Sequence, residues 1–171
     1  MRRLAAILPI AALMALIALF WGYSLNHDPK VIPMALVGKP VPALSLPPLA
    51  GGAPSPIRGL ATGPALINFY ASWCGPCAQE APALMALKAE GVKVIGVAYE
   101  DQPDAAKAFL TRFGDPYQAV LSDRDGRAGI EFGVTGVPET YAVDAHGVIR
   151  AKLAEPITAA EAEEMLQTAA R

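Results

Sequence analysis

Apolar residues in this chain form short runs separated by segments rich in helix-forming residues. Residues 65–71 (ALINFYA) and 92–99 (VKVIGVAY) are apolar and partly β-branched, a pattern that predicts two buried strands. Residues 78–90 are rich in helix formers and Gly91 ends the pattern, so a helix is expected between the strands. The order strand, helix, strand is typical of an α/β domain.

The alternation continues beyond residue 100. Residues 105–113 predict a helix with Asp101 as its cap and Pro103 in its first turn. Residues 117–121 predict a third strand, and a short helix is expected at residues 128–132.

The last part of the chain predicts a hairpin followed by a helix. Residues 140–143 and 148–153 flank the turn-forming sequence 144–147. Thr158 and Glu161 are spaced as a capping box that opens a helix. Together the elements predict an α/β sandwich with a central mixed β-sheet.

The N-terminus differs in character from the rest. Arg2 and Arg3 precede residues 4–23, which carry no charge and are long enough to span a bilayer as a helix. The two arginines would hold the N-terminus in the cytoplasm. A cleaved signal peptide is the alternative, but its apolar region is usually shorter and ends in a small-x-small site, and no convincing site follows Trp21.

These features divide the chain into three parts. We expect a transmembrane anchor over residues 1–25, a tether over 26–37 and one domain over 38–171. In a bacterium this places the domain in the periplasm, held at the inner membrane, where thiols are oxidised. The net charge of −2 gives no reason to expect a nucleic-acid partner.

The candidate chemistry lies between the first predicted strand and helix. Cys74 and Cys77 are the only cysteines, and a Cys-x-x-Cys pair in this setting indicates a thiol–disulfide redox centre. A zinc site would need histidine ligands, and neither His27 nor His146 is suitably spaced, so no metal is expected. A purely structural disulfide is the alternative, but so small a loop removes little entropy from the unfolded chain.

The two cysteines have different expected roles. Cys74 lies at the mouth of the helix, where free amides and the helix dipole favour a thiolate, so it should be the nucleophile. Cys77 lies in the first turn and should resolve the mixed disulfide between Cys74 and a substrate.

The sequence Trp73-Cys74-Gly75-Pro76-Cys77 resembles the active site of thioredoxins. Pro82 matches the proline that kinks the active-site helix in that superfamily. Residues 136–140 (GVPET) resemble its cis-proline loop, which implies a cis Val137–Pro138 bond and pairing of the residue 137 main chain with an extended substrate. Compared with a minimal thioredoxin, one helix and one strand are inserted before Pro138. The residues expected to contact substrate are Trp73, Gly75, Pro76, Val137, Pro138 and Glu139.

Three further stretches sharpen the resemblance. Residues 35–42 (ALVGKPVP), 133–140 (GVTGVPET) and 144–150 (DAHGVIR) are similar to the thiol:disulfide interchange proteins of cytochrome c maturation, the CcmG or DsbE family. The resemblance implies a membrane-tethered reductase that receives electrons from a transmembrane donor of the DsbD or CcdA type. Its expected substrate is the Cys-x-x-Cys-His disulfide of apocytochrome c, or a thiol protein of the haem lyase. No bound cofactor is implied.

Two departures concern potential and proton transfer. Gly75-Pro76 is the dipeptide of general thioredoxins, whereas members of the closer family often carry other residues there. Asn68 stands where thioredoxin has a buried aspartate, and an amide cannot take a proton at neutral pH. Glu80, one turn beyond Cys77, is the candidate proton shuttle, with a solvated helix residue as the alternative.

An acidic rim and the direction of the reaction are further hypotheses. Glu139 and the pair Glu100-Asp101 would form the rim, unless they are ordinary solvated residues. A general disulfide oxidase or exchanger and a non-catalytic module that binds thiol partners are the alternatives to a reductase. A peroxidase is disfavoured because its proline-threonine-cysteine motif is missing.

Overall fold

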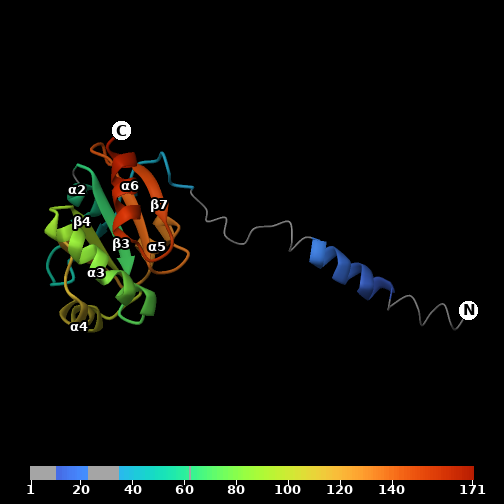
Figure 1. The fold of residues 1–171 in the computed structure, drawn as a ribbon. Coiled ribbons are helices and arrows are strands. Elements are labelled where there is room, and N and C mark those ends of the chain that lie inside the picture. The colour runs from blue at the N-terminus through green and yellow to red at the C-terminus, as the bar shows by residue number, and fades with distance from the viewer. Residues whose placement is uncertain (1–10, 23–34, 62) are drawn as a thin grey trace, which may run out of the picture. The chain divides into compact units, whose positions relative to one another are not determined.

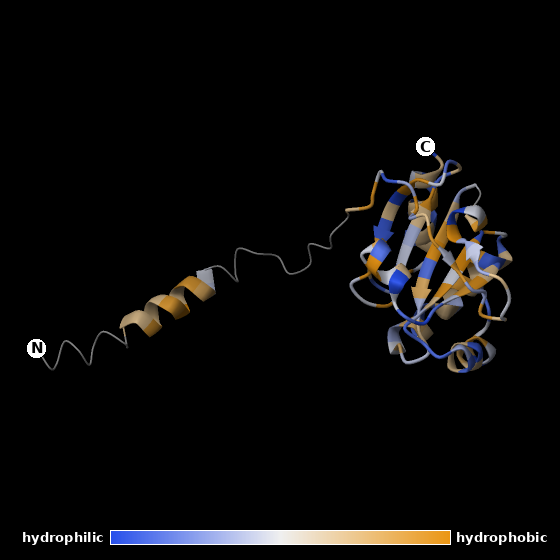
Figure 2. Cartoon of the chain, turned by 180° about the vertical axis from the view of Figure 1, so that it is seen from behind, coloured by the Kyte–Doolittle hydropathy of each residue, from blue (hydrophilic) through white to orange (hydrophobic). Residues whose placement is uncertain are grey.

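The computed structural model describes residues 11–22, 35–61 and 63–171, which belong to two compact units, Met1–Pro33 and Met34–Arg171. In the first unit residues 11–22 form a mainly hydrophobic helix (Figure 2), and the large apolar side chains of this helix are exposed. The remainder of the predicted anchor and most of the predicted tether lie outside the described residues. Within the described ranges, no helix combines the length and the apolar character needed to cross a bilayer.

A five-stranded sheet forms the centre of the second unit, in the order β5-β4-β3-β6-β7 (Figure 1). β3 is parallel to β4 and β4 to β5, whereas β6 is antiparallel to both β3 and β7. β3 is buried at every position, as a continuous apolar run requires. The strands are β3 Ala65–Tyr70, β4 Val94–Tyr99, β5 Ala119–Asp123, β6 Glu139–Val143 and β7 Ile149–Leu153.

Helices cover both faces of this sheet. Buried residues of α3, α4 and α6 form one core cluster with the cysteines, and buried residues of α2 and α5 form a second cluster on the opposite face. The predicted α/β sandwich with a mixed central sheet is therefore confirmed. The helices are α2 Ile57–Leu60, α3 Gly75–Ala89, α4 Pro103–Phe113, α5 Arg127–Phe132 and α6 Ala159–Ala169.

The helix and the strand that were predicted as an insertion correspond to α4 and β5. β5 lies at the edge of the sheet. A short hairpin of β1 (Ser45–Leu46) and β2 (Ser55–Pro56) precedes α2. Its loop covers part of the β5 edge, because the Leu49 amide donates to the Val120 carbonyl at 2.8 Å. This contact shields an edge strand that would otherwise present unpaired main-chain groups.

Two local predictions need correction, and one is confirmed. β5 begins two residues later than predicted, because the Asp115 carboxylate accepts the Tyr117 amide and holds the chain in a turn. Gln102, not Asp101, is the N-cap of α4. The capping box of Thr158 and Glu161 at the start of α6 is present as predicted.

Candidate active site

Strand β3 leads directly into the cysteine pair at the start of α3. Cys74 is the N-cap residue of α3, and the Cys77 amide donates to Cys74 Sγ at 3.1 Å. The two cysteines form a disulfide and only 5% and 2% of their surfaces are exposed. Cys74 therefore occupies the helix N-terminus, a position where negative charge is stabilised. The predicted placement of the pair is confirmed.

The loop between α5 and β6 faces the disulfide. Its Val137–Pro138 peptide bond is cis, as predicted, and the Val137 carbonyl oxygen lies 3.4 Å from Cys74 Sγ. Pro138 is buried and Val137 half-buried, whereas Gly136 is exposed. The main chain therefore reaches the surface beside the sulfur that is expected to attack. Gly75 and Pro76, in the first turn of α3, are exposed at the same place.

Glu80 lies one turn beyond Cys77 on α3 and is buried, with 1% of its surface exposed. Its carboxylate accepts hydrogen bonds from Asn68 Nδ2 at 2.9 Å and from the Ile157 amide at 3.0 Å. Burial raises the pKa of Glu80 from 4.5 to about 7, because desolvation outweighs the two hydrogen bonds that favour the charged form. The alternative of a solvated helix residue is therefore wrong.

Three buried polar side chains, Tyr117, Asn68 and Thr140, form a hydrogen-bonded network with Glu80. The Tyr117 hydroxyl donates to Asn68 Oδ1 at 2.7 Å, and Asn68 Nδ2 donates to Thr140 Oγ1 at 3.0 Å as well as to Glu80. Tyr117 reaches this position because Gly96 has no side chain: a Cβ there would lie 2.7 Å from the tyrosine ring. Sequence reasoning missed Tyr117, which stands in a segment that looked like an ordinary strand.

The segment that follows β4 holds the residues just before the cysteines in place. Asp101 is buried and accepts the Ser72 amide at 2.6 Å and the Ser72 hydroxyl at 2.8 Å. Trp73 is 60% exposed, and its indole nitrogen donates to the Glu100 carbonyl at 3.4 Å. Trp73 therefore presents a surface beside Cys74 and does not belong to the core.

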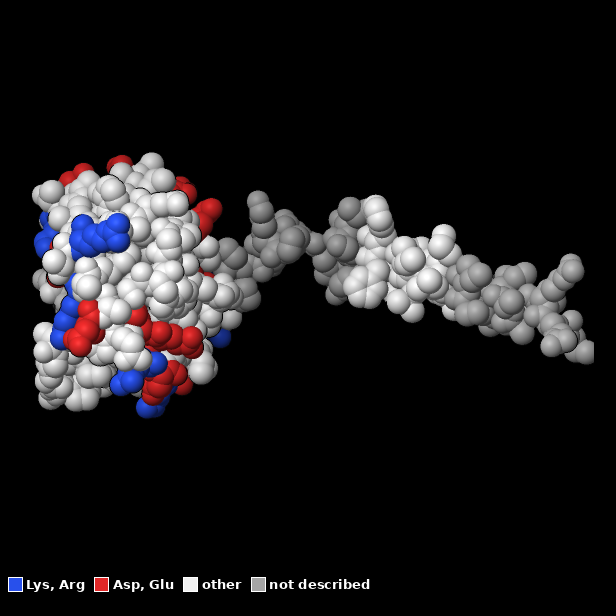
Figure 3. Space-filling model, turned by 90° about the horizontal axis from the view of Figure 1, so that it is seen from below, with Lys and Arg blue, Asp and Glu red and all other residues white. Residues whose placement is uncertain are grey.

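The predicted acidic rim does not form. Asp101 is buried against Ser72, and Glu139 is buried with 1% of its surface exposed, so only Glu100 of the three is exposed. Figure 3 views the molecule from the side on which β3 ends, and acidic and basic side chains lie next to one another there within a largely uncharged surface. For Asp101 and Glu139 the alternative of ordinary solvated residues is also wrong, because hydrogen-bond partners in the fold allow both carboxylates to be buried.

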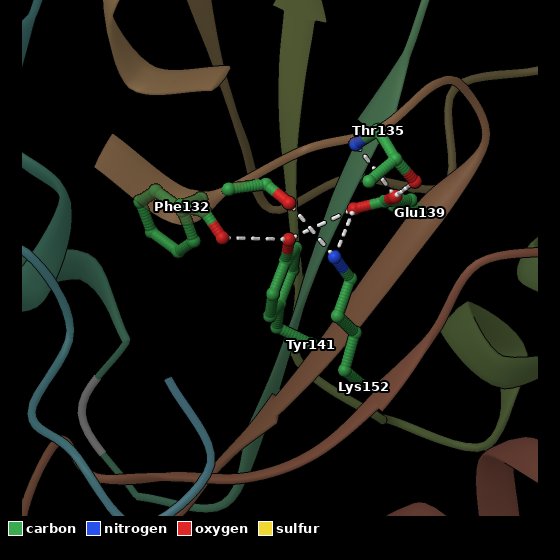
Figure 4. A network of polar contacts seen from close by, with 6 residues as sticks. Phe132, Thr135, Glu139, Tyr141 and Lys152 are labelled. Carbon is green, nitrogen blue, oxygen red and sulfur yellow. Dashed lines mark hydrogen bonds and ion pairs between the residues drawn. The ribbon is translucent and has the colours of Figure 1, made fainter. Parts of the chain in front are cut away.

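The Glu139 carboxylate belongs to a polar network with Thr135, Tyr141 and Lys152 (Figure 4). Tyr141 packs in the core cluster that does not contain the cysteines. The Glu139 carboxylate accepts from Thr135 and Tyr141 and forms an ion pair with Lys152 at 2.9 Å. Direct substrate contact by this side chain was expected from the sequence, and the burial contradicts it. The structure thus places Trp73, Gly75 and Pro76 at the surface around Cys74, with Val137 half-buried beside it. Pro138, Cys77 and Glu80 are buried.

Comparisons with known proteins agree with this geometry. Residues 36–166 match the Redoxin family model. The chain is 46% identical over 156 residues to the thiol:disulfide interchange protein DsbE of Allochromatium vinosum, covering 90% of this chain and 86% of the relative. It is 43% identical over 134 residues to HelX of Rhodobacter capsulatus (78% and 76% covered) and 37% identical over 156 residues to DsbE of Escherichia coli (88% and 84%).

Solved structures show the same fold. The structure of MTB dsbF, in mixed oxidised and reduced forms, has a TM-score of 0.67 and 28% identity, with 74% of this chain and 95% of that chain covered. A secreted Mycobacterium tuberculosis disulfide oxidoreductase homologous to E. coli DsbE has a TM-score of 0.61 and 25% identity, with 74% and 93% covered. The thioredoxin-like fold predicted from the sequence is confirmed.

Proposed function

Since the chain belongs to the redoxin family, and within it to the DsbE-type thiol:disulfide interchange proteins, we propose that it is a reductase of cytochrome c maturation. Its substrate is the Cys-x-x-Cys-His disulfide of apocytochrome c, or a thiol protein of the haem lyase. The observation that carries the proposal is the Cys74–Cys77 disulfide at the start of α3, with the buried carboxyl of Glu80 one turn away. The similarity to proteins named DsbE and HelX supports the choice of substrate.

The reaction transfers two electrons from the two cysteines to the substrate disulfide, whose sulfurs take up two protons, one released by Cys77 and one from the solvent. The Cys74 thiolate attacks one sulfur of the substrate disulfide, a mixed disulfide forms, and the other substrate sulfur leaves as a thiolate and takes a proton. Cys77 then loses its proton and attacks Cys74 Sγ. The second substrate sulfur leaves as a thiolate and is protonated in turn, and the Cys74–Cys77 disulfide remains.

Glu80 suits the proton transfer in the second step. A group that accepts a proton efficiently has a pKa near the working pH, and burial raises the pKa of Glu80 to about 7. Glu80 lies three residues after Cys77 on the same helix, so the two side chains project to nearly the same side. Asn68 orients the Glu80 carboxylate by donating a hydrogen bond to it.

We place the domain in the periplasm, anchored to the inner membrane by residues 4–23. Each turnover leaves the enzyme oxidised, so a transmembrane donor of the DsbD or CcdA type must return two electrons to Cys74 and Cys77. The only redox group that the reaction needs is the cysteine pair itself.

The reduction potential of the protein tests the direction of the reaction. A reductase should have a value near or below that of thioredoxin, about −270 mV, whereas a value near −120 mV would make the protein an oxidase and reverse the proposal. Cys77→Ser tests the mechanism, because without its resolving thiol the enzyme should accumulate mixed disulfides through Cys74. Cys74→Ser is the matched control and should trap none.

A further inference from the structure

A buried ion pair lies behind the cis-proline loop, on the opposite face of β6 from the disulfide. Glu139 begins β6, Lys152 lies in β7, and their side chains are 1% and 3% exposed. The carboxylate and the ammonium are 2.9 Å apart, and the ammonium also lies over the Tyr141 ring, 5.3 Å from its centroid. The thiol chemistry described above uses neither residue.

The pair and its neighbours hold the main chain of the loop at three points (Figure 4). Lys152 Nζ donates to the Gly133 carbonyl at 2.9 Å. The Tyr141 hydroxyl lies within hydrogen-bond distance of the Phe132 carbonyl (3.0 Å) and of Glu139 Oε2 (2.8 Å), and its single proton can be donated to either acceptor. Glu139 Oε1 accepts the Thr135 amide at 2.8 Å and the Thr135 hydroxyl at 2.5 Å. The hydrogen bonds between Glu139 and Thr135 close residues 135–139 into a small ring, and Val137 lies midway between these two residues in the sequence.

The first half of this ring has little support from packing, whereas Val137 packs against both core clusters and Pro138 is buried. Thr135 and Gly136 are exposed, so packing restrains these two residues only weakly. Stability alone is a poor reason for a buried ion pair, because desolvation of both charges offsets most of their attraction. What the pair does supply is a set of directed hydrogen bonds to Gly133 and Thr135, just before the residue whose carbonyl faces Cys74.

We propose that Glu139, held by Lys152, is a positioning residue that fixes the Thr135–Val137 main chain beside Cys74 and so favours disulfides carried on extended polypeptide over small disulfides. An extended polypeptide can pair with exposed main-chain groups, whereas a small disulfide only needs to reach the sulfur. A displaced loop therefore impairs the first reaction more than the second. The inference rests on the proposed reductase activity but not on the identity of its natural substrate.

The test compares two probes with the full-length protein, reduced beforehand. Insulin carries its disulfides on polypeptide, and bis(2-hydroxyethyl) disulfide has no peptide groups. The measured quantity is the ratio of the second-order rate constants for the two probes. The variants are Thr135→Val, which removes the hydroxyl that Glu139 accepts, Thr135→Ser, which keeps it, and Glu139→Gln.

We expect the insulin-to-small-disulfide ratio to fall about tenfold in Thr135→Val and Glu139→Gln, because misplaced groups can slow a reaction by up to about a hundredfold. Thr135→Ser should keep the ratio of the unmodified protein. Thr135 is exposed, so its variants are expected to fold and decide the matter even if Glu139→Gln does not.

Other outcomes would overturn the inference. An unchanged ratio in Thr135→Val would show that the Glu139 contact does not position the loop for polypeptide. A ratio that falls as far in Thr135→Ser as in Thr135→Val would show that the hydroxyl is irrelevant. If the unmodified protein reduces neither probe, the proposed reductase activity itself fails, and this result is distinct from a change in the ratio.

Discussion

Replacing Glu80 by glutamine should remove a defined pH dependence from the stability of the oxidised protein. Burial raises the pKa of Glu80 from 4.5 to about 7, so between these values the folded protein binds more protons than the unfolded chain. The free energy of unfolding therefore falls as the pH rises through this interval and levels off above it. At about 1.4 kcal/mol for each pH unit, Glu80 accounts for a loss of about 3 kcal/mol.

Urea unfolding of the oxidised protein at several values between pH 4.5 and pH 8 measures this effect. A carboxamide does not titrate, so Glu80→Gln should gain about 3 kcal/mol relative to the unmodified protein across the range. The titration of other groups contributes equally to both proteins and cancels when their free energies of unfolding are subtracted. Glu90→Gln is the matched control, since it makes the same chemical change at an exposed residue at the end of the same helix. If both variants keep the pH dependence of the unmodified protein, the raised pKa of Glu80 is refuted.

Urea unfolding also tests two other features, the packing of Gly96 against Tyr117 and the Glu139–Lys152 ion pair. Gly96→Ala adds a methyl group 2.7 Å from the Tyr117 ring, and we expect it to lower stability by about 1–3 kcal/mol; a neutral effect would mean that the ring can move aside. Lys152→Met leaves the Glu139 carboxylate buried without its cation and should lower the free energy of unfolding by about 3–5 kcal/mol. The double variant Lys152→Met/Glu139→Gln has no unpaired charge and should recover most of this loss. Equal losses in the single and double variants would contradict the ion-pair argument.

The sequence was sufficient for the fold and for the central chemistry because these depend on local patterns. The runs at residues 65–71 and 92–99 are apolar enough to specify buried strands, and the only cysteines fall where a strand meets a helix. The cis Val137–Pro138 bond was also predicted, from the resemblance of residues 136–140 to a known loop. In each case the deciding residues are neighbours in the chain.

The Glu139–Lys152 pair shows why the rest could not be predicted. If the pairing of Val143 with Ile149 continued regularly along the hairpin, Tyr141 would lie opposite Ala151 and Lys152 would be on the other face of the sheet. An irregularity between Ala142 and Val143 shifts the register by one residue, and Tyr141 pairs with Lys152. A one-residue shift exchanges the faces of a strand, so this small feature brings the ammonium to Glu139.

The relation between Asn68 and Glu80 depends on contacts from two strands, one helix and two connecting segments. Asn68 stands where thioredoxins carry a buried aspartate, and its amide donates to Glu80 while accepting from Tyr117. Two carboxylates in contact at positions 68 and 80 would raise each other's pKa and could share the site only if one were protonated. An amide at position 68 avoids this conflict. Glu80 is then the one group of this hydrogen-bonded network that titrates near neutral pH. Asparagine at 68 therefore does not remove the buried acid from the fold, but allows α3 to supply it from the turn that follows Cys77.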